Sequence, residues 1–294
     1  MNAFDYRAPR GLDEALAVLS EYGEDARAIA GGTALVTMMR QRLVRPSCLV
    51  SLRDVQGLDR IEADNGSLRL GALVKLREVE VSPLVRERLP VLAETCRRVA
   101  TVRVRNMATV GGALAHADPN QDPPVTLLAL GARVEIRGAR GSRELPLGAF
   151  FRDYYETALE PGELVTAVTV PTLPAASGAA FLKFLPRTAD DYATVAAAAI
   201  VTLESDGERC REARIALGSV GVTPLRASAA EGLLAGERRG ENILRAAGAA
   251  ARTSVDPLSD HRGSAAYKRE MTAVMVERAL AQAWDAAQRS ALAR

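Results

Sequence analysis

The sequence is poor in cysteine, histidine and long apolar runs, and each shortage excludes a class of protein. Its three cysteines (Cys48, Cys96 and Cys210) are far apart and form no Cys-x-x-Cys pair, whereas an iron–sulfur cluster needs about four thiolates. Neither histidine has a nucleophile motif beside it, so we predict no catalytic residue and no metal site. No apolar run approaches about 18 residues and the N-terminal residues carry no signal-peptide pattern. Unpaired cysteines are typical of a reducing compartment, so we expect a cytoplasmic protein without a membrane span.

Excess charge is also missing. The chain has 38 basic and 36 acidic side chains, a formal net charge of +2. A nucleic-acid partner would favour a strongly basic face, so we expect none. The 294 residues, 48% of them hydrophobic, are enough for two ordinary globular domains.

Hydrophobic spacing predicts an α+β protein. Helices are expected at 12–22, 34–42, 90–101, 228–235, 241–251 and 264–292, and through Leu127, Leu128 and Leu130. Strands are expected at 26–30, 48–52, 67–73, 132–137, 164–170, 179–185, 194–204 and 215–220. The segment from Pro171 to Gly178 is rich in Pro, Ala and Ser and is predicted to be a linker. After it, strands precede helices, which favours an α+β domain over a doubly wound sheet.

Two short glycine turns are the candidates for ligand binding, Ala30-Gly31-Gly32-Thr33 and Thr109-Val110-Gly111-Gly112-Ala113. Paired glycines permit positive φ and let a ligand approach the backbone closely. Successive N–H groups there form an anion-binding concavity, to which a following helix adds partial positive charge. The two turns are therefore predicted to converge on one pyrophosphate. Each turn alone is more often a tight connection, and neither matches a dinucleotide fingerprint or a P-loop.

The sequence as a whole resembles the flavoprotein subunits of the molybdenum hydroxylases, the family of xanthine dehydrogenase and aerobic carbon monoxide dehydrogenase. The resemblance rests on five ordered blocks that span nearly the whole chain. They are Ala30–Leu35, Arg105–Pro119 (RNMATVGGALAHADP), Thr157–Val165 (TALEPGELV), Leu217–Arg226 (LGSVGVTPLR) and Asp260–Lys268 (DHRGSAAYK).

The resemblance implies an FAD-binding domain of the PCMH type at 1–173, with two subdomains that meet near residue 54. A smaller α+β domain of the carbon monoxide dehydrogenase flavoprotein type follows at 178–294. It also implies that the FAD diphosphate and ribose lie on two segments, formed by Ile29, Ala30, Gly31, Gly32, Thr33, Ala34 and Leu35 and by Thr109, Val110, Gly111, Gly112 and Ala113. Further cofactor contacts are implied at His116, Asp118, Asp122, Val165, Lys183 and Tyr192.

Several of these residues have plainer interpretations. Asp118 is equally suited to cap the helix that follows it. Lys183 in a strand is by default a surface side chain, and Tyr192 a strand aromatic. By resemblance, Lys183 stabilises negative charge on reduced flavin and Tyr192 packs against the ring. His116 is expected to order a loop or contact the cofactor, and His261 to be structural.

Two positions depart from the family pattern. Relatives commonly carry a polar residue where Ala34 stands and Asn or Ser where Ala113 stands. Each alanine removes a side-chain hydrogen bond worth about 0.5–1.5 kcal/mol net. We therefore expect FAD to be held more weakly or anchored differently.

The resemblance implies an oxidoreductase subunit that does not touch the organic substrate. In the family, electrons pass from a molybdopterin-binding large subunit through a [2Fe–2S] small subunit to FAD and then to an external acceptor. The expected assembly is a dimer of heterotrimers. A self-contained FAD-dependent oxidase or reductase of the same fold is the alternative, but it needs acid–base residues that are not evident here. A non-catalytic interaction module is a third interpretation.

Overall fold

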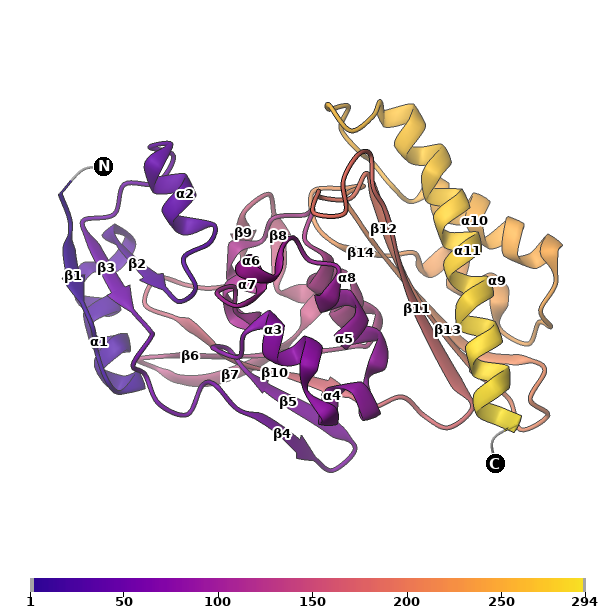
Figure 1. Ribbon diagram of the computed structural model, residues 1–294, viewed down its shortest axis with the longest axis horizontal. Coiled ribbons are helices and arrows are strands. Elements are labelled where there is room, and N and C mark those ends of the chain that lie inside the picture. Colours follow the sequence, from indigo (N-terminus) through magenta and orange to yellow (C-terminus); the bar gives the residue numbers. More distant parts are fainter. Residues whose placement is uncertain (1–2, 293–294) are drawn as a thin grey trace.

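The computed structural model describes residues 3–292, which form successive β-sheets along the chain (Figure 1). The first sheet is parallel, in the order β1-β3-β2, with β1 at Asp5–Arg7, β2 at Ala26–Ile29 and β3 at Cys48–Ser51. Helix α1 (Leu12–Tyr22), followed by the 3-10 turn Gly23–Asp25, buries Leu16 and Leu19 against this sheet. Helix α2 (Leu35–Arg40) follows β2 after the first glycine turn.

The second sheet is antiparallel, in the order β4-β5-β10-β6-β7. Its strands are β4 (Ile61–Asp64), β5 (Ser67–Gly71), β6 (Arg133–Gly138), β7 (Gly141–Pro146) and β10 (Leu164–Pro171). Between β5 and β6 run α3 (Leu76–Val81), α4 (Pro83–Arg88), α5 (Pro90–Arg97), α6 (Val102–Arg105), α7 (Val110–His116) and α8 (Asp122–Ala129). A 3-10 turn (Leu147–Ala149) and a hairpin of β8 (Phe151–Asp153) and β9 (Glu156–Thr157) separate β7 from β10.

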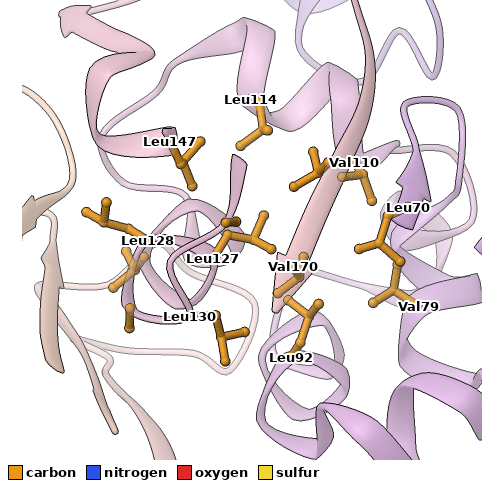
Figure 2. Packing of buried hydrophobic residues seen from close by; sticks show 14 of the residues in the cluster. Leu70, Val79, Leu92, Val110, Leu114, Leu127, Leu128, Leu130, Leu147 and Val170 are labelled. Atoms are coloured by element: carbon orange, nitrogen blue, oxygen red, sulfur yellow. The ribbon is translucent and has the colours of Figure 1, made fainter. Parts of the chain in front are cut away.

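The core of this middle region joins helices to the sheet. Figure 2 shows Val110 of α7 beside Leu70 of β5 and Val170 of β10, with Leu127 of α8 packed into the same cluster. All four side chains are nearly inaccessible to solvent. This packing holds the start of α7, and with it the second glycine segment, against the sheet.

The third sheet is antiparallel, in the order β11-β12-β13-β14. Its strands are β11 (Ser177–Phe184), β12 (Val195–Leu203), β13 (Cys210–Gly218) and β14 (Leu225–Arg226), followed by α9 (Ser228–Leu234), α10 (Glu241–Thr253) and α11 (Ala265–Leu292). Strand β12 is buried along its whole length, with alternate residues in two different cores. One face packs on α8 and the other on α11 (Figure 1), which explains its run of alanines.

The predicted α+β order and most predicted elements are present, with three corrections. The linker predicted from Pro171 to Gly178 is present but shorter, at 172–176, because β10 includes Pro171 and β11 begins at Ser177. The strand predicted at 215–220 begins at Cys210 and ends at Gly218. Helix α2 is shorter than the predicted 34–42. Short elements such as β1, α3, α4 and α6 are additions that periodicity did not indicate.

Two absences concern residues 3–292 only. None of their helices combines the length and apolar character needed to cross a membrane. Within the same residues there is no group of three or more His, Cys, Asp or Glu side chains placed to hold a metal ion.

Candidate functional site

A single cleft of about 1210 Å³ extends from the first sheet to the third. Its walls come from the β2–α2 segment, the α5–α7 region, the start of β10 and the β11–β12 connection. The predicted site residues that line it are Ile29, Ala30, Gly31, Gly32, Thr33, Ala34, Leu35, Thr109, Gly111, Gly112, Ala113, His116, Asp122, Val165, Lys183 and Tyr192. Residues scattered over most of the sequence thus meet in one concavity.

The first glycine segment is a turn with unused donors. Gly32 has φ +67°, a conformation that favours glycine. The N–H groups of Gly31, Gly32 and Thr33 have no hydrogen-bond acceptor within the described part of the chain. The Gly32 carbonyl, by contrast, accepts the N–H of Val36 as α2 begins. This segment is therefore the kind of N–H concavity that binds anions.

The second glycine segment differs from its prediction, because its N–H groups are already used. Gly111 N–H donates to the Ala72 carbonyl at 2.8 Å, and Gly112 N–H to the Thr109 hydroxyl at 3.1 Å. Ala113 N–H donates to the Thr109 carbonyl at 2.9 Å. The two glycines lie in the first turn of α7, with Thr109 as its N-cap. The segment supplies a helix terminus and a surface without Cβ atoms, not a second open set of donors.

The two segments touch directly. A Cβ atom on Gly31 would lie 1.9 Å from the Met107 carbonyl oxygen and 3.1 Å from Ala108 Cα. Gly31 must therefore be glycine for the first turn to reach the turn between α6 and Thr109. On the opposite side, Gly111 packs on Ala72, where a Cβ would lie 2.5 Å from Ala72 Cβ. Close backbone contacts thus bring the two glycine segments together at the floor of the cleft.

A buried ion pair forms part of the cleft wall. Lys183 of β11 donates to Asp122 Oδ2 at 2.7 Å and to the Arg98 carbonyl at 3.2 Å. The two side chains are 3% and 4% exposed, so Lys183 is no surface residue. Burial raises the pKa of Asp122 to about 6, although Lys183 opposes this rise. Asp122 Oδ1 is buried and has no partner within residues 3–292.

Three further predicted residues line the same cleft. Val165 is buried in β10 at a bulge in its pairing with β6, and bulges re-aim backbone near sites. His116 ends α7, and its ring lies 5.2 Å from that of Tyr155; burial lowers its pKa. Tyr192 is 43% exposed with Arg262 over its ring. Desolvation of its hydroxyl, together with Asp118, raises the pKa of Tyr192 to about 12.

Two predicted residues do not line the cleft. The side chain of Val110 lies in the hydrophobic core. The Asp118 carboxylate accepts the Asn120 backbone and side-chain N–H groups, both at 2.9 Å, and so orders the turn before α8. The alternative that Asp118 caps the following helix is wrong, because Gln121 occupies the N-cap position of α8.

Sequence reasoning missed several residues that line the cleft. Val99 and Ala100 follow α5, Tyr155 lies in the β8–β9 turn, and Asp190 and Asp191 precede Tyr192. The signal for the Asp190–Asp191 pair was weak, because nothing in the local pattern separates them from a solvated turn. Tyr155 has φ +56°, a strained conformation for a non-glycine residue that sequence alone does not reveal.

Two family models together match most of the chain. Residues 2–173 match the FAD binding domain in molybdopterin dehydrogenase, and residues 180–283 match the CO dehydrogenase flavoprotein C-terminal domain. These matches confirm the predicted fold class of an FAD-binding domain followed by a smaller α+β flavoprotein domain.

Individual proteins agree with the family models. The chain is 39% identical to the 6-hydroxypseudooxynicotine dehydrogenase complex subunit alpha of Paenarthrobacter nicotinovorans, over 96% of this chain and 94% of the relative. It is 38% identical to the carbon monoxide dehydrogenase medium chain of Afipia carboxidovorans, over 96% of both chains.

Solved structures are equally similar. A chain in the crystal structure of the cyanide-inactivated Cu,Mo-CO dehydrogenase superposes with a TM-score of 0.93 at 38% identity, over 97% of this chain and 98% of that one. A chain of quinoline 2-oxidoreductase from Pseudomonas putida 86 gives 0.92 at 36% identity, over 98% and 99%. This protein therefore belongs to the FAD-binding subunits of the molybdenum hydroxylase family, as an oxidoreductase subunit similar to the carbon monoxide dehydrogenase medium chain.

Proposed function

We propose that FAD spans the cleft, with its diphosphate at the first glycine segment and its flavin ring near Val165, Lys183 and Tyr192. The observation that carries this proposal is the continuity of the cleft from Gly32 to Tyr192. The unused N–H groups of Gly31, Gly32 and Thr33 suit a diphosphate. Gly112 presents no Cβ to the cleft, which leaves room for a close ligand approach.

The other end of the cleft suits a planar ring with polar edges. Val165 offers a buried aliphatic wall, and Tyr192 an aromatic face. Lys183 places an ammonium group at the cleft wall, where it stabilises the negative charge that reduction brings to a flavin. Bound FAD supplies transfer of electrons one or two at a time. The unpartnered Asp122 Oδ1 is an acceptor for a donor that residues 3–292 do not provide.

We infer that the electrons come from a partner subunit. The three cysteines are buried and separate, and residues 3–292 form no metal site. The chain therefore receives electrons from the [2Fe–2S] clusters of a small subunit, and a molybdopterin-binding large subunit oxidises the substrate. In support, the relatives are named as a complex subunit and as medium chains. A dimer of heterotrimers in the cytoplasm, which passes electrons to an external acceptor, stays our prediction for the assembly.

The purified chain tests the proposal. Heat-released extract is expected to contain FAD at about one molecule per chain, and the chain alone is expected to oxidise no organic substrate. Substrate oxidation should appear only after the large and small subunits are added. A chain that binds only the mononucleotide, or that oxidises a substrate by itself, would contradict the proposal in favour of a different flavoprotein or a self-contained flavoenzyme.

A further inference from the structure

Behind the cleft wall, Arg105 forms a buried hydrogen-bonded junction although it does not line the cleft. It ends α6 and is 9% exposed. Its Nε donates to Glu80 Oε2 at 2.9 Å, and its Nη1 donates to the Val99 and Ala100 carbonyls, both at 2.8 Å. One guanidinium thus joins α3 to the turn that follows α5.

Glu80 is itself held in place. It is 5% exposed, and its Oε1 accepts a hydrogen bond from Arg77 at 2.5 Å. Its backbone carbonyl accepts Arg86 Nε at 2.9 Å. Burial opposes ionisation of Glu80, but the hydrogen bonds and charges of Arg77 and Arg105 together outweigh it and lower its pKa. Arg105 therefore has a rigid, negatively charged partner that fixes its side chain.

The turn that Arg105 holds is part of the cleft. Ala100 has φ +38°, a left-handed conformation that an alanine rarely adopts without support. Val99 and Ala100 line the cleft. The preceding carbonyl, that of Arg98, accepts the Lys183 ammonium at 3.2 Å. Contacts therefore connect Glu80 to Lys183 without a break. Arg105 fixes the Val99 and Ala100 carbonyls, and the adjacent Arg98 carbonyl accepts the Lys183 ammonium.

We propose that Arg105 is a positioning residue for the FAD site. By clamping the Val99 and Ala100 carbonyls, Arg105 sets the Arg98 carbonyl and, through it, the place of the Lys183 ammonium. A lysine at position 105 keeps the charge but cannot reach Glu80 and two carbonyls with a planar fork. This inference rests on the proposed function, in which Lys183 lies beside the flavin.

The first test compares Arg105→Lys with wild type in the full-length chain. Expected results are FAD binding weakened about 10-fold or more and a more negative FAD midpoint potential. The matched control is Arg226→Lys, which disrupts another part-buried arginine fork, Arg226 Nε to Glu231 Oε1 at 2.6 Å, outside the cleft. Arg226→Lys should change neither quantity. If Arg105→Lys fails to fold, Glu80→Gln replaces it in the test. This substitution keeps the size of the side chain that accepts the Arg105 hydrogen bond but removes its charge.

The second test asks whether Arg105 acts through Lys183. Lys183→Met is expected to make the FAD potential more negative, and Arg105→Lys in that background should produce no further shift, because the group that it positions is gone. An equal potential shift in both backgrounds, or none beyond that of Arg226→Lys, overturns the inference. If Lys183→Met leaves the potential unchanged, the proposed location of the flavin fails instead.

Discussion

The ammonium of Lys183 and the carboxylate of Asp122 form a buried ion pair between the third sheet and α8, with Nζ and Oδ2 2.7 Å apart. The two residues are separated by 61 positions in the sequence. Their pair joins the two parts of the chain that match separate family models. Because both side chains also line the cleft, the same contact serves domain packing and the ligand site, and its removal has consequences for both.

Lys183→Met should destabilise the chain most at alkaline pH. Loss of one partner from a buried pair typically costs about 3–5 kcal/mol. Without the ammonium, the pKa of Asp122 rises beyond the wild-type value of about 6, so the carboxyl becomes protonated in acid and the cost shrinks there. Urea unfolding at pH 5 and pH 8 measures this difference. Arg252→Met is the control, since Arg252 and Glu270 form an exposed pair worth about 1 kcal/mol or less. Equal losses at both pH values would contradict the expectation.

The wild-type pair should also make stability depend on pH. The folded-state pKa of Asp122, about 6, lies above the ordinary value of 3.8, so the folded chain holds an extra proton between these values. The stabilising effect of protonated Asp122 is full below pH 4 and lost as pH rises through 6, by about 3 kcal/mol. Between pH 4 and pH 7, the free energy of unfolding of wild type should therefore fall relative to that of Asp122→Asn. A flat difference would mean that Asp122 ionises normally.

Gly31→Ala should separate the two glycine segments. The new Cβ would overlap the Met107 carbonyl, and overpacking of this kind costs about 1–3 kcal/mol. FAD affinity should fall in the same variant, because the turn that carries the free N–H groups must move. Calorimetry and flavin fluorescence titration measure the two effects. Gly232→Ala in α9 is the control, since a Cβ there meets nothing within 4 Å and alanine favours helix by about 1 kcal/mol. Undiminished FAD binding by Gly31→Ala would show that the segments do not act together.

Local patterns in the sequence predicted the longer elements and the two glycine segments. A continuous apolar run or helical spacing over eight or more residues, as in β12 and α11, is strong enough to recognise. The short elements that were missed, such as β1 and α3, carry too few positions for a period, and their stability comes from tertiary packing.

The site was predicted less completely, for a physical reason. Resemblance identified Lys183 and Asp122 separately, but their pairing depends on how the third sheet packs on α8, which local spacing does not encode. The same holds for Arg105, whose partners Glu80 and Val99 lie on other elements. The free N–H groups were predicted at both glycine segments but are present only at the first, because helix α7 begins one residue before Gly111.

Gly178 lies where composition extended the predicted linker too far, and it offers a direct test. It lies in β11, not in a flexible connection, and a Cβ there would be 2.1 Å from the Ala283 carbonyl oxygen and 2.2 Å from Ala287 N. The residue thus lets α11 approach the sheet backbone. In a linker, Gly→Ala would be neutral or stabilising by about 0.4–1 kcal/mol, because it restricts the unfolded chain.

In β11, Gly178→Ala should instead cost about 1–3 kcal/mol, because α11 must shift away from the strand. Urea unfolding of Gly178→Ala against wild type, with Gly232→Ala measured alongside, decides between the two. FAD affinity of the folded variant should stay at the wild-type value, since Gly178 is not among the residues that line the cleft. A stabilised variant would refute the packing role. Lost stability with lost FAD affinity would show that the position of α11 is transmitted along β11 to Lys183, five residues further along the same strand.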